Sequence, residues 1–402
     1  MKRVDFLEIE GKSGGFFLLL GALGALLIAA LGSAYFMEHN GHVVTGMNNQ
    51  IVWGIPHVFA VFLIVAASGA INVASVSSVF KKPAYKPLAP LSGLLAMGLL
   101  AGGLAVLVLD LGRPDRLIVA MTHYNFKSIF AWNIFLYTGF MAVVFVYLWM
   151  MMERRFNKYS RPAGITAFIW RLMLTTGTGS IFGFLVARQA YDAAIMAPMF
   201  IIMSLAFGTA IYILVLMAAY KWTGRELGQF VLSKLRSLLG IFIAAVFLIV
   251  ATYHLTNLYV AENAGVESFI LFDGNVYTYM FWLGQILIGT ALPLALIFSP
   301  QLKTSNNALV YASIFTIVGG LAQLYVIIIG GQAFPMDIFP GYEVTSSFFD
   351  GQIGMYNPSI PEIMLGVGGI AIAGLIVTIG VKLLKFLPAN LSDNAVDPHH
   401  KG

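Results

Sequence analysis

The sequence LLAMGLLAGGLAVLVLDLGRPDR, residues 94–116, decides how the chain is interpreted. Residues 94–109 carry no charged side chain, whereas residues 110–116 contain two aspartates and two arginines together with a glycine and a proline. An uncharged run of this length is typical of a membrane-spanning helix, because a helix satisfies its own backbone hydrogen bonds in lipid. Asp110 then stands where lipid gives way to water, and an ionisable group at such a position is a candidate for function.

The composition of the 402-residue chain predicts an all-α polytopic membrane protein. Hydrophobic residues make up 59% of the chain and charged residues 10%, whereas a soluble domain carries about a quarter charged residues. The chain has no cysteine, so it cannot itself hold a disulfide or a cysteine-ligated Fe–S cluster. Any such centre would belong to a partner protein. No carboxylate cluster indicates a metal site, and no basic stripe interleaved with aromatic residues indicates nucleic acid.

Apolar runs of about 20 residues predict ten transmembrane helices. The predicted spans are residues 16–37, 53–79, 88–110, 129–152, 164–187, 194–220, 238–260, 277–298, 307–330 and 361–387. Most of the 23 lysines and arginines fall in the loops on one side of this arrangement and at the two ends of the chain. Because cytoplasmic loops carry such an excess, residues 1–15 and 388–402 are predicted to be cytoplasmic tails. Residues 110–116 then face the outer, periplasm-like side of the inner membrane.

Polar and aromatic residues gather at the outer ends of consecutive predicted helices. They are His57 in the second span, Asp110 at the end of the third, Trp132 in the fourth and Tyr191 after the fifth. At about 1.5 Å of rise per residue, these side chains share one depth. A pocket of this kind suits a lipid-soluble quinone, because aromatic residues hold the ring, an imidazole or phenol hydrogen-bonds a carbonyl, and a carboxylate passes protons. Trp53 would complete the wall of this pocket.

Arg113 is the predicted charge partner of Asp110, which would handle protons at the pocket. Two further sets of polar residues are candidates for a proton path through the membrane. The first set shares a face of the second span and reaches the fifth: Ser68, Asn72, Ser75 and Arg171. The second set lies in the outer halves of the seventh, eighth and ninth spans: His254, Asn257, Gln285 and Gln323.

Each of these features also has a purely structural explanation. Intramembrane histidines such as His57 and His254 often hold helices together, and Trp132 fits an interfacial aromatic belt. Arg171 can reach the cytoplasmic side with its long side chain. Asp110 and Arg113 can be a helix-end ion pair.

Other functional classes fit the sequence less well. A haem-binding protein is less favoured, because a haem would need histidines at matched depth on facing helices. A secondary transporter is the main rival, because Pro198 and Pro293 interrupt their helices, but transporters bind their substrates at the midplane. A structural anchor for a partner complex is the remaining alternative.

Four motifs resemble the NrfD/PsrC family of integral membrane, quinone-interacting subunits of molybdopterin and Fe–S oxidoreductase complexes. They are Trp53-Gly54 before Val61-Phe62-Leu63, Ser68-Gly69-Ala70, Leu109 to Arg116, and Ser128-Ile129-Phe130-Ala131-Trp132. The ten-helix form is similar to the branch that includes DsrP, HybB and QrcD. The motifs are confined to residues 53–133, and the rest of the sequence matches by helix number and topology.

The resemblance implies two consecutive four-helix bundles, residues 53–190 and 194–330, with peripheral first and last helices. It implies a quinone, menaquinone or ubiquinone, at the outer face of the first bundle below a partner that carries Fe–S clusters. His57 matches the family's polar turn approximately, and Asn49 could supply the same contact. Tyr191 stands where the family has a quinone-bonding tyrosine. The family carries no haem, and its complexes add membrane and cytochrome subunits.

These observations together predict a quinone-interacting subunit with no complete activity alone. It would exchange electrons with a periplasmic, ferredoxin-like Fe–S subunit, with possible links to proton translocation and dissimilatory sulfur metabolism. The outer loop at residues 332–360 is rich in proline and aromatic residues, including Pro340, Phe348 and Phe349. It is predicted to be a cap that either docks the partner or folds over the protein's own helices.

Overall fold

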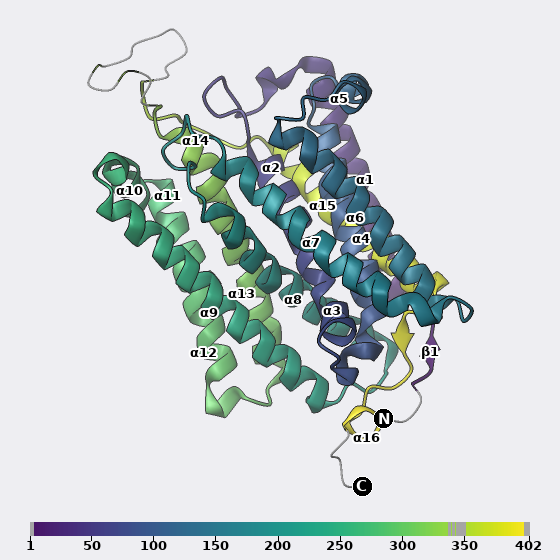
Figure 1. Cartoon of the computed structure of the whole chain (residues 1–402). Helices are drawn as coiled ribbons and strands as arrows, with labels where there is room; N and C mark the ends of the chain where they lie inside the picture. Colours follow the sequence, from purple (N-terminus) through teal and green to yellow (C-terminus); the bar gives the residue numbers. More distant parts are fainter. Residues whose placement is uncertain (1–3, 337–338, 340–341, 343–350, 398–402) are drawn as a thin grey trace.

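The fold is almost entirely helical, as the composition predicts (Figure 1). The computed structural model describes residues 4–336, 339, 342 and 351–397. Within this part of the sequence, the strands are the short β1 (Phe6–Leu7) and β2 (Leu387–Pro388). The predicted cap residues Pro340, Phe348 and Phe349 lie outside the described residues.

Nine helical segments among the described residues are long and apolar enough to cross a membrane. They comprise α1 (Gly14–Asn40), α2 and α3 (Ile55–Ala70, Asn72–Ser78), α4 (Ala89–Leu109), α6 (Ile129–Met152), α8 (Met196–Thr223), α9 (Gln229–Tyr259), α11 to α12 (Val276–Tyr279, Leu292–Phe298), α13 and α14 (Asn306–Tyr325, Gly331–Ala333) and α15 (Ile360–Leu383). A tenth long helix, α7 (Ser160–Gly183), is less apolar because it contains two arginines and a run of threonine and glycine. The short helices α5 (Leu117–Thr122), α10 (Ala264–Leu271) and α16 (Asp393–Val396) lie in connections.

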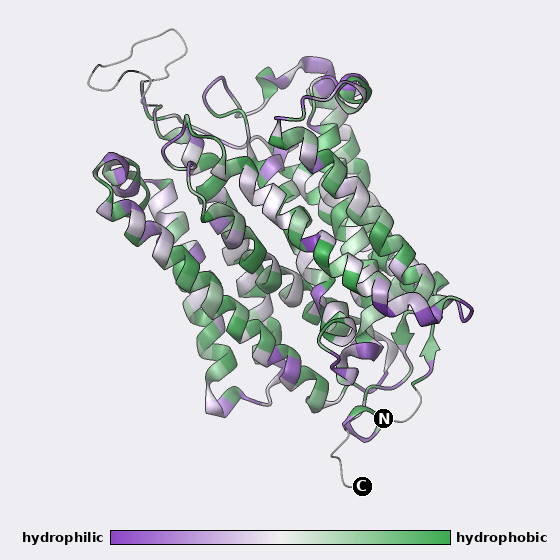
Figure 2. Ribbon diagram, in the orientation of Figure 1, coloured by the Kyte–Doolittle hydropathy of each residue, from purple (hydrophilic) through white to green (hydrophobic). Residues whose placement is uncertain are grey.

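The hydropathy of the sequence follows these helices. Figure 2 shows that hydrophobic residues run along the helix bodies, while hydrophilic residues gather at the helix ends and in the connections. This distribution is expected for helices that face lipid, because apolar side chains on the outer surface are in contact with hydrocarbon and not with water. The prediction of a polytopic helical membrane protein is therefore confirmed.

Following the predicted bundles, we refer to α2, α3, α4, α6 and α7 as the first helix group and to α8, α9, α11, α12 and α13 as the second. Helix α8 packs against α2 and α7 as well as against α9 and α13, so the two groups are in close contact. They meet where α2 crosses α8: a Cβ atom on Gly69 would overlap the carbonyl oxygen of Ser204, and one on Gly208 would overlap the backbone of Ala70. Only glycine permits this close approach. Helix α15 packs against α4, and the largely exposed α1 packs against α15.

The second predicted span is interrupted at Ile71, which separates α2 from α3. The hydroxyl of Ser92 on α4 donates to the Ala70 carbonyl over 2.7 Å and accepts from the Ala74 N–H over 3.2 Å. A hydroxyl that serves both backbone groups allows a helix to break within a membrane protein. The junction between α2 and α3 is therefore stabilised by a neighbouring helix.

Both ends of the protein lie at one end of the molecule (Figure 1). There β1 and β2 pair antiparallel, with Phe6 opposite Pro388 and Leu7 opposite Leu387. The predicted even number of crossings agrees with this arrangement, while the assignment of this side to the cytoplasm stays a prediction. We call the opposite end, where α2 begins and α4 ends, the distal end.

Candidate functional site

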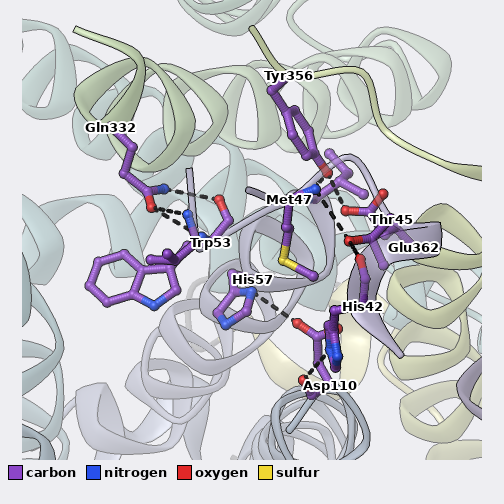
Figure 3. Close-up of polar contacts among 11 residues, drawn as sticks. His42, Thr45, Met47, Trp53, His57, Asp110, Gln332, Tyr356 and Glu362 are labelled. Carbon is purple, nitrogen blue, oxygen red and sulfur yellow. Dashed lines mark hydrogen bonds and ion pairs between the residues drawn. The ribbon is translucent and has the colours of Figure 1, made fainter. Parts of the chain in front are cut away.

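A histidine and an aspartate meet at the distal end of the first group (Figure 3). His57 lies in the first turn of α2, and Asp110 caps the end of α4. His57 Nδ1 lies 3.1 Å from Asp110 Oδ2. The Asp110 side chain is 2% exposed, and neither carboxylate oxygen has a hydrogen bond within the described residues. A buried carboxylate in this state is poised to exchange a proton with the imidazole.

The imidazole of His57 presents its other nitrogen to a ligand. Because Nδ1 faces Asp110, Nε2 lies on the opposite side of the ring, and the side chain is 22% exposed. The Trp53 and His57 rings lie 6.4 Å apart, and Trp53 is flanked by Phe130 and Phe182 at 6.1 and 5.9 Å. An aromatic wall beside a reachable imidazole nitrogen suits a flat ring that carries a hydrogen-bonding oxygen.

Gln332 of α14 fixes the backbone of Trp53. Its side-chain oxygen accepts from the N–H groups of Val52 and Trp53 over 2.9 and 3.0 Å, and its amide donates to the Trp53 carbonyl over 3.0 Å. Arg188 donates to the carbonyls of Gln332 and Gln50 over 2.8 Å each. These bonds hold the aromatic wall in place from a segment almost 280 residues away in sequence.

A second set of bonds fixes the start of α2. The Tyr356 hydroxyl accepts from the Ile55 N–H and donates to Glu362 Oε1, over 2.7 Å in each case. Glu362 is 0% exposed, and its Oε2 accepts from the N–H groups of Gly46 and Ser359. Burial raises the pKa of the Tyr356 phenol, so this hydroxyl stays a donor. The support around His57 is thus rigid and fully hydrogen-bonded.

The second group contains another histidine and carboxylate. His254 Nδ1 on α9 lies 2.7 Å from Glu267 Oε2 on α10, and Asn257 donates to Glu267 Oε1 over 2.9 Å. The Glu267 side chain is 0% exposed and that of His254 is 12% exposed. The Glu267 carboxylate is therefore completely buried, and both of its oxygens are hydrogen-bonded.

Two cavities lie between the helices of the second group. His254, Gln285 and Gln323 line the first, which has space for a water molecule. The second cavity is smaller. The same two glutamines line it, together with Thr290 and Thr316. Both cavities are thus lined by Gln285 and Gln323, and we refer to the two cavities together as the column.

Comparisons with known proteins identify the family. Residues 43–336, most of the sequence, match the family model described as polysulphide reductase, NrfD. The chain belongs to the NrfD family. It is 28% identical to an Hdr-like menaquinol oxidoreductase integral membrane subunit of Archaeoglobus fulgidus, over 98% of this chain and 99% of the relative.

Two further relatives match over most of their length. The integral membrane subunit of a menaquinone reductase of Nitratidesulfovibrio vulgaris is 22% identical over 89% of this chain and 88% of its own length. A selenate reductase subunit of Mesobacillus selenatarsenatis is 22% identical over 90% of this chain and 92% of its own length. The family resemblance drawn from residues 53–133 is therefore confirmed.

One predicted contact in this NrfD chain is wrong. Arg113 does not pair with Asp110: its guanidinium donates to both carboxylate oxygens of Asp115 over 2.9 and 2.8 Å. Both side chains are exposed, 63% and 59%. The hydrogen bond lowers the pKa of Asp115. The turn after α4 directs Arg113 toward solvent, so the buried Asp110 faces histidines instead.

Three other predicted ligands, Trp132, Asn49 and Tyr191, have surroundings in the structure that do not include a contact with His57 among the described residues. Trp132 is exposed, and its indole donates to the Phe126 carbonyl over 2.9 Å. Asn49 is exposed in the loop before α2. Tyr191 is 0% exposed and donates to the Ile328 carbonyl over 2.6 Å, and Phe182 stands between it and Trp53. Burial raises the pKa of the Tyr191 phenol. Its hydrogen bond joins the segment after α7 to the segment after α13.

The structure brings together only some residues of the first predicted proton path. Ser68 donates to the Arg171 carbonyl over 3.2 Å, and Arg171 Nη1 lies 3.5 Å from the Ser68 carbonyl. Arg171 is 2% exposed, so its side chain stays inside the helix packing, while its Nε has no hydrogen bond within the described residues. Ser75 bonds to the Ile71 carbonyl in its own helix, and Asn72 is buried.

Sequence reasoning missed His42 and Glu267, which each pair with a predicted residue. His42 Nε2 lies 3.8 Å from Asp110 Oδ1, and Glu267 binds His254. Both follow a predicted span within a few residues of its outer end. A census of ionisable residues in the outer loops would have included them, although only the fold selects them from the other candidates.

Proposed function

We propose that this NrfD chain binds a quinol or quinone at the distal end of its first helix group. One observation carries the proposal: the buried Asp110 carboxylate lies 3.1 Å from His57 Nδ1, and the other imidazole nitrogen remains available beside Trp53. This arrangement is chemically suited to take a proton from a ring hydroxyl or to return it. The relatives named as menaquinol and menaquinone enzymes favour menaquinone as the quinone.

The proton chemistry follows from the order of the groups. A quinol hydroxyl hydrogen-bonded to His57 Nε2 transfers its proton there, and Nδ1 passes a proton to Asp110 Oδ2. Each quinol yields two protons and two electrons, and the electrons leave to a redox centre of a partner subunit, since this chain has no cysteine to hold an Fe–S cluster. Quinone reduction uses the same steps in reverse.

The partner is proposed to be a ferredoxin-like Fe–S subunit on the distal side, within a larger complex that includes other membrane and cytochrome subunits. We assign the distal end to the periplasmic side and both termini to the cytoplasm, because the basic loops lie at the terminal end. A role in sulfur metabolism as DsrP is a finer proposal. The relatives named above do not single out DsrP within the family.

Binding of a quinone-site inhibitor to the purified complex tests the site. A hydroxyquinoline N-oxide is expected to bind to the unaltered protein, with its fluorescence quenched, and to bind much more weakly to His57→Ala. His39→Ala is the matched control, because His39 is exposed at the end of α1. Equal binding by His57→Ala and the unaltered protein would refute the site. Solute flux without a redox partner would instead identify a transporter, and an anchor would show neither flux nor inhibitor binding.

We further propose that protons cross part of the membrane through the second group. The column of small cavities beside Gln285 and Gln323 supports this route over the one through Ser68, Asn72, Ser75 and Arg171, along which Ser75 binds its own helix. A water in the column would find amide partners, as a proton path requires. His254 lines the first cavity, and Asn257 binds the same carboxylate, Glu267, as His254 does.

Charge movement in liposomes distinguishes the two routes. Gln285→Leu is expected to abolish charge movement while electron transfer continues, whereas Asn72→Leu leaves both intact. Thr252→Val on the exposed face of α9 serves as control. Charge movement that survives Gln285→Leu and fails in Asn72→Leu would assign the path to the first group.

A further inference from the structure

We propose that His42 is the proton port of the quinone site, and that its imidazole carries protons between Asp110 and water at the distal end. The inference rests on the quinol chemistry proposed above and extends it from the pocket to the surface. It assigns a function to a residue of the loop between α1 and α2, outside the helices that hold His57 and Asp110.

The three groups form a series from the pocket to the surface. Asp110 Oδ2 faces His57, whereas Asp110 Oδ1 faces His42 Nε2 at 3.8 Å (Figure 3). His42 Nε2 also lies 2.9 Å from the Asp110 carbonyl oxygen. The His42 side chain is 32% exposed and that of Asp110 is 2% exposed. The buried carboxylate therefore has an imidazole on each side, and His42 is the one more open to solvent.

The local sequence holds His42 in this position. Helix α1 ends at Asn40, and Gly41 adopts a φ of 78°, a left-handed conformation that favours glycine. The short turn His42–Val44 follows, and Thr45 Oγ1 donates to the His42 carbonyl over 2.6 Å. The ring packs against Gly112, where a Cβ atom would lie 3.6 Å from His42 Cε1 and Nδ1. The imidazole is thus placed by two segments.

The other ionisable groups around Asp110 bind to other residues. Glu362 on α15, whose charge also acts on Asp110, accepts from Tyr356, Gly46 and Ser359 and is 0% exposed. Arg113 in the turn after α4 binds Asp115. Among the described neighbours, two titratable side chains face the carboxylate and are partly exposed: His57, which stands beside Trp53 in the pocket, and His42, which is the more exposed of the two.

The proton balance is complete with this residue. The protonated carboxyl group of Asp110 turns about its Cβ–Cγ bond, so that the proton received on the His57 side faces His42, and gives it to Nε2 of the His42 tautomer that carries hydrogen on Nδ1. The imidazolium then loses the Nδ1 proton to water. The resulting tautomer carries hydrogen on Nε2, which can donate to the Asp110 carbonyl oxygen 2.9 Å away. Proton exchange with water restores the Nδ1–H tautomer before the next cycle. Two such cycles release the two protons of one quinol, whose electrons go to the partner's redox centre. Quinone reduction draws two protons inward by the same series.

Turnover of a naphthoquinol by the purified complex, with a dye accepting electrons from the partner, tests the port. We expect His42→Gln to lower turnover at least about tenfold, because glutamine can still donate to the Asp110 carbonyl but cannot carry a proton. Inhibitor affinity should stay unchanged. His42→Ala should be equally slow and should recover when imidazole is added, with a larger solvent isotope effect before rescue.

His39→Ala is the matched control, since His39 lies three residues earlier and is exposed. Normal turnover in His42→Gln would overturn the port while leaving the quinone site intact. Slow turnover in His42→Ala without imidazole rescue, together with normal turnover in His42→Gln, would show that His42 is only structural. Failure of the unaltered complex to bind the inhibitor would instead refute the quinone site itself.

Discussion

The two helix groups each place a histidine beside a carboxylate near the distal end, but the two pairs are built differently. Asp110 has no hydrogen bond to its carboxylate within the described residues, and His57 is partly exposed beside Trp53. Glu267 accepts from His254 and Asn257 and is completely buried. Residue type alone therefore does not identify a reactive pair, because hydrogen bonding and access determine whether a carboxylate can exchange protons.

The largest expected effect concerns the two carboxylates. Asp110→Asn should lower quinol turnover about 100-fold, because an amide of the same size cannot accept a proton from His57. Glu267→Gln should leave turnover of the dye-coupled reaction nearly unchanged. Steady-state rates of the purified complex measure both, and Asp115→Asn in the exposed turn is the control. Equal losses in the two variants would remove the distinction between the pairs.

The unfolding free energy should depend more on Glu267 than on Asp110, which is the opposite of the order expected for turnover. Glu267→Leu leaves the donors of His254 and Asn257 unpaired in a buried place, which should cost about 2 kcal/mol of unfolding free energy. Asp110→Asn should have little effect on stability, because the carboxylate satisfies no hydrogen bond among the described residues. Thermal unfolding in detergent measures the difference, with exposed Glu262→Gln as control. A larger loss for Asp110→Asn would mean that Asp110 is the structural carboxylate.

Ligand affinity should separate the two histidines. His57→Ala should weaken binding of a hydroxyquinoline N-oxide about tenfold, the value of one hydrogen bond of about 1.4 kcal/mol. His254→Ala should bind as tightly as the unaltered protein, since Glu267 and the surrounding helices enclose its ring. Fluorescence titration provides both constants. A loss confined to His254→Ala would move the quinone to the second group.

Arg113 should have the smallest effect. Arg113→Ala breaks an exposed pair with Asp115, and such pairs contribute little. Turnover and inhibitor affinity should each change less than about twofold. A loss comparable with that of Asp110→Asn would restore the sequence-based hypothesis that Arg113 controls the charge of Asp110.

Much of the site could be predicted because its main residues stand at helix ends. His57 and Asp110 share a depth once the spans are counted, and the structure brings them together. The depth of a residue in the membrane does not tell in which direction around the helix axis its side chain points. Tyr191 has the predicted depth but points to Ile328, and Trp132 points to Phe126, so the aromatic neighbours of Trp53 are Phe130 and Phe182 instead.

The sequence by itself determined that this is a helical membrane protein of the NrfD family, because apolar runs and local motifs are properties of short segments. Only the tertiary structure decided the partners of Asp110. His42 reaches it across 68 residues of sequence, and Glu362 fixes the loop before α2 across 316. Contacts of this range depend on how the helices rotate and pack, which no local pattern encodes.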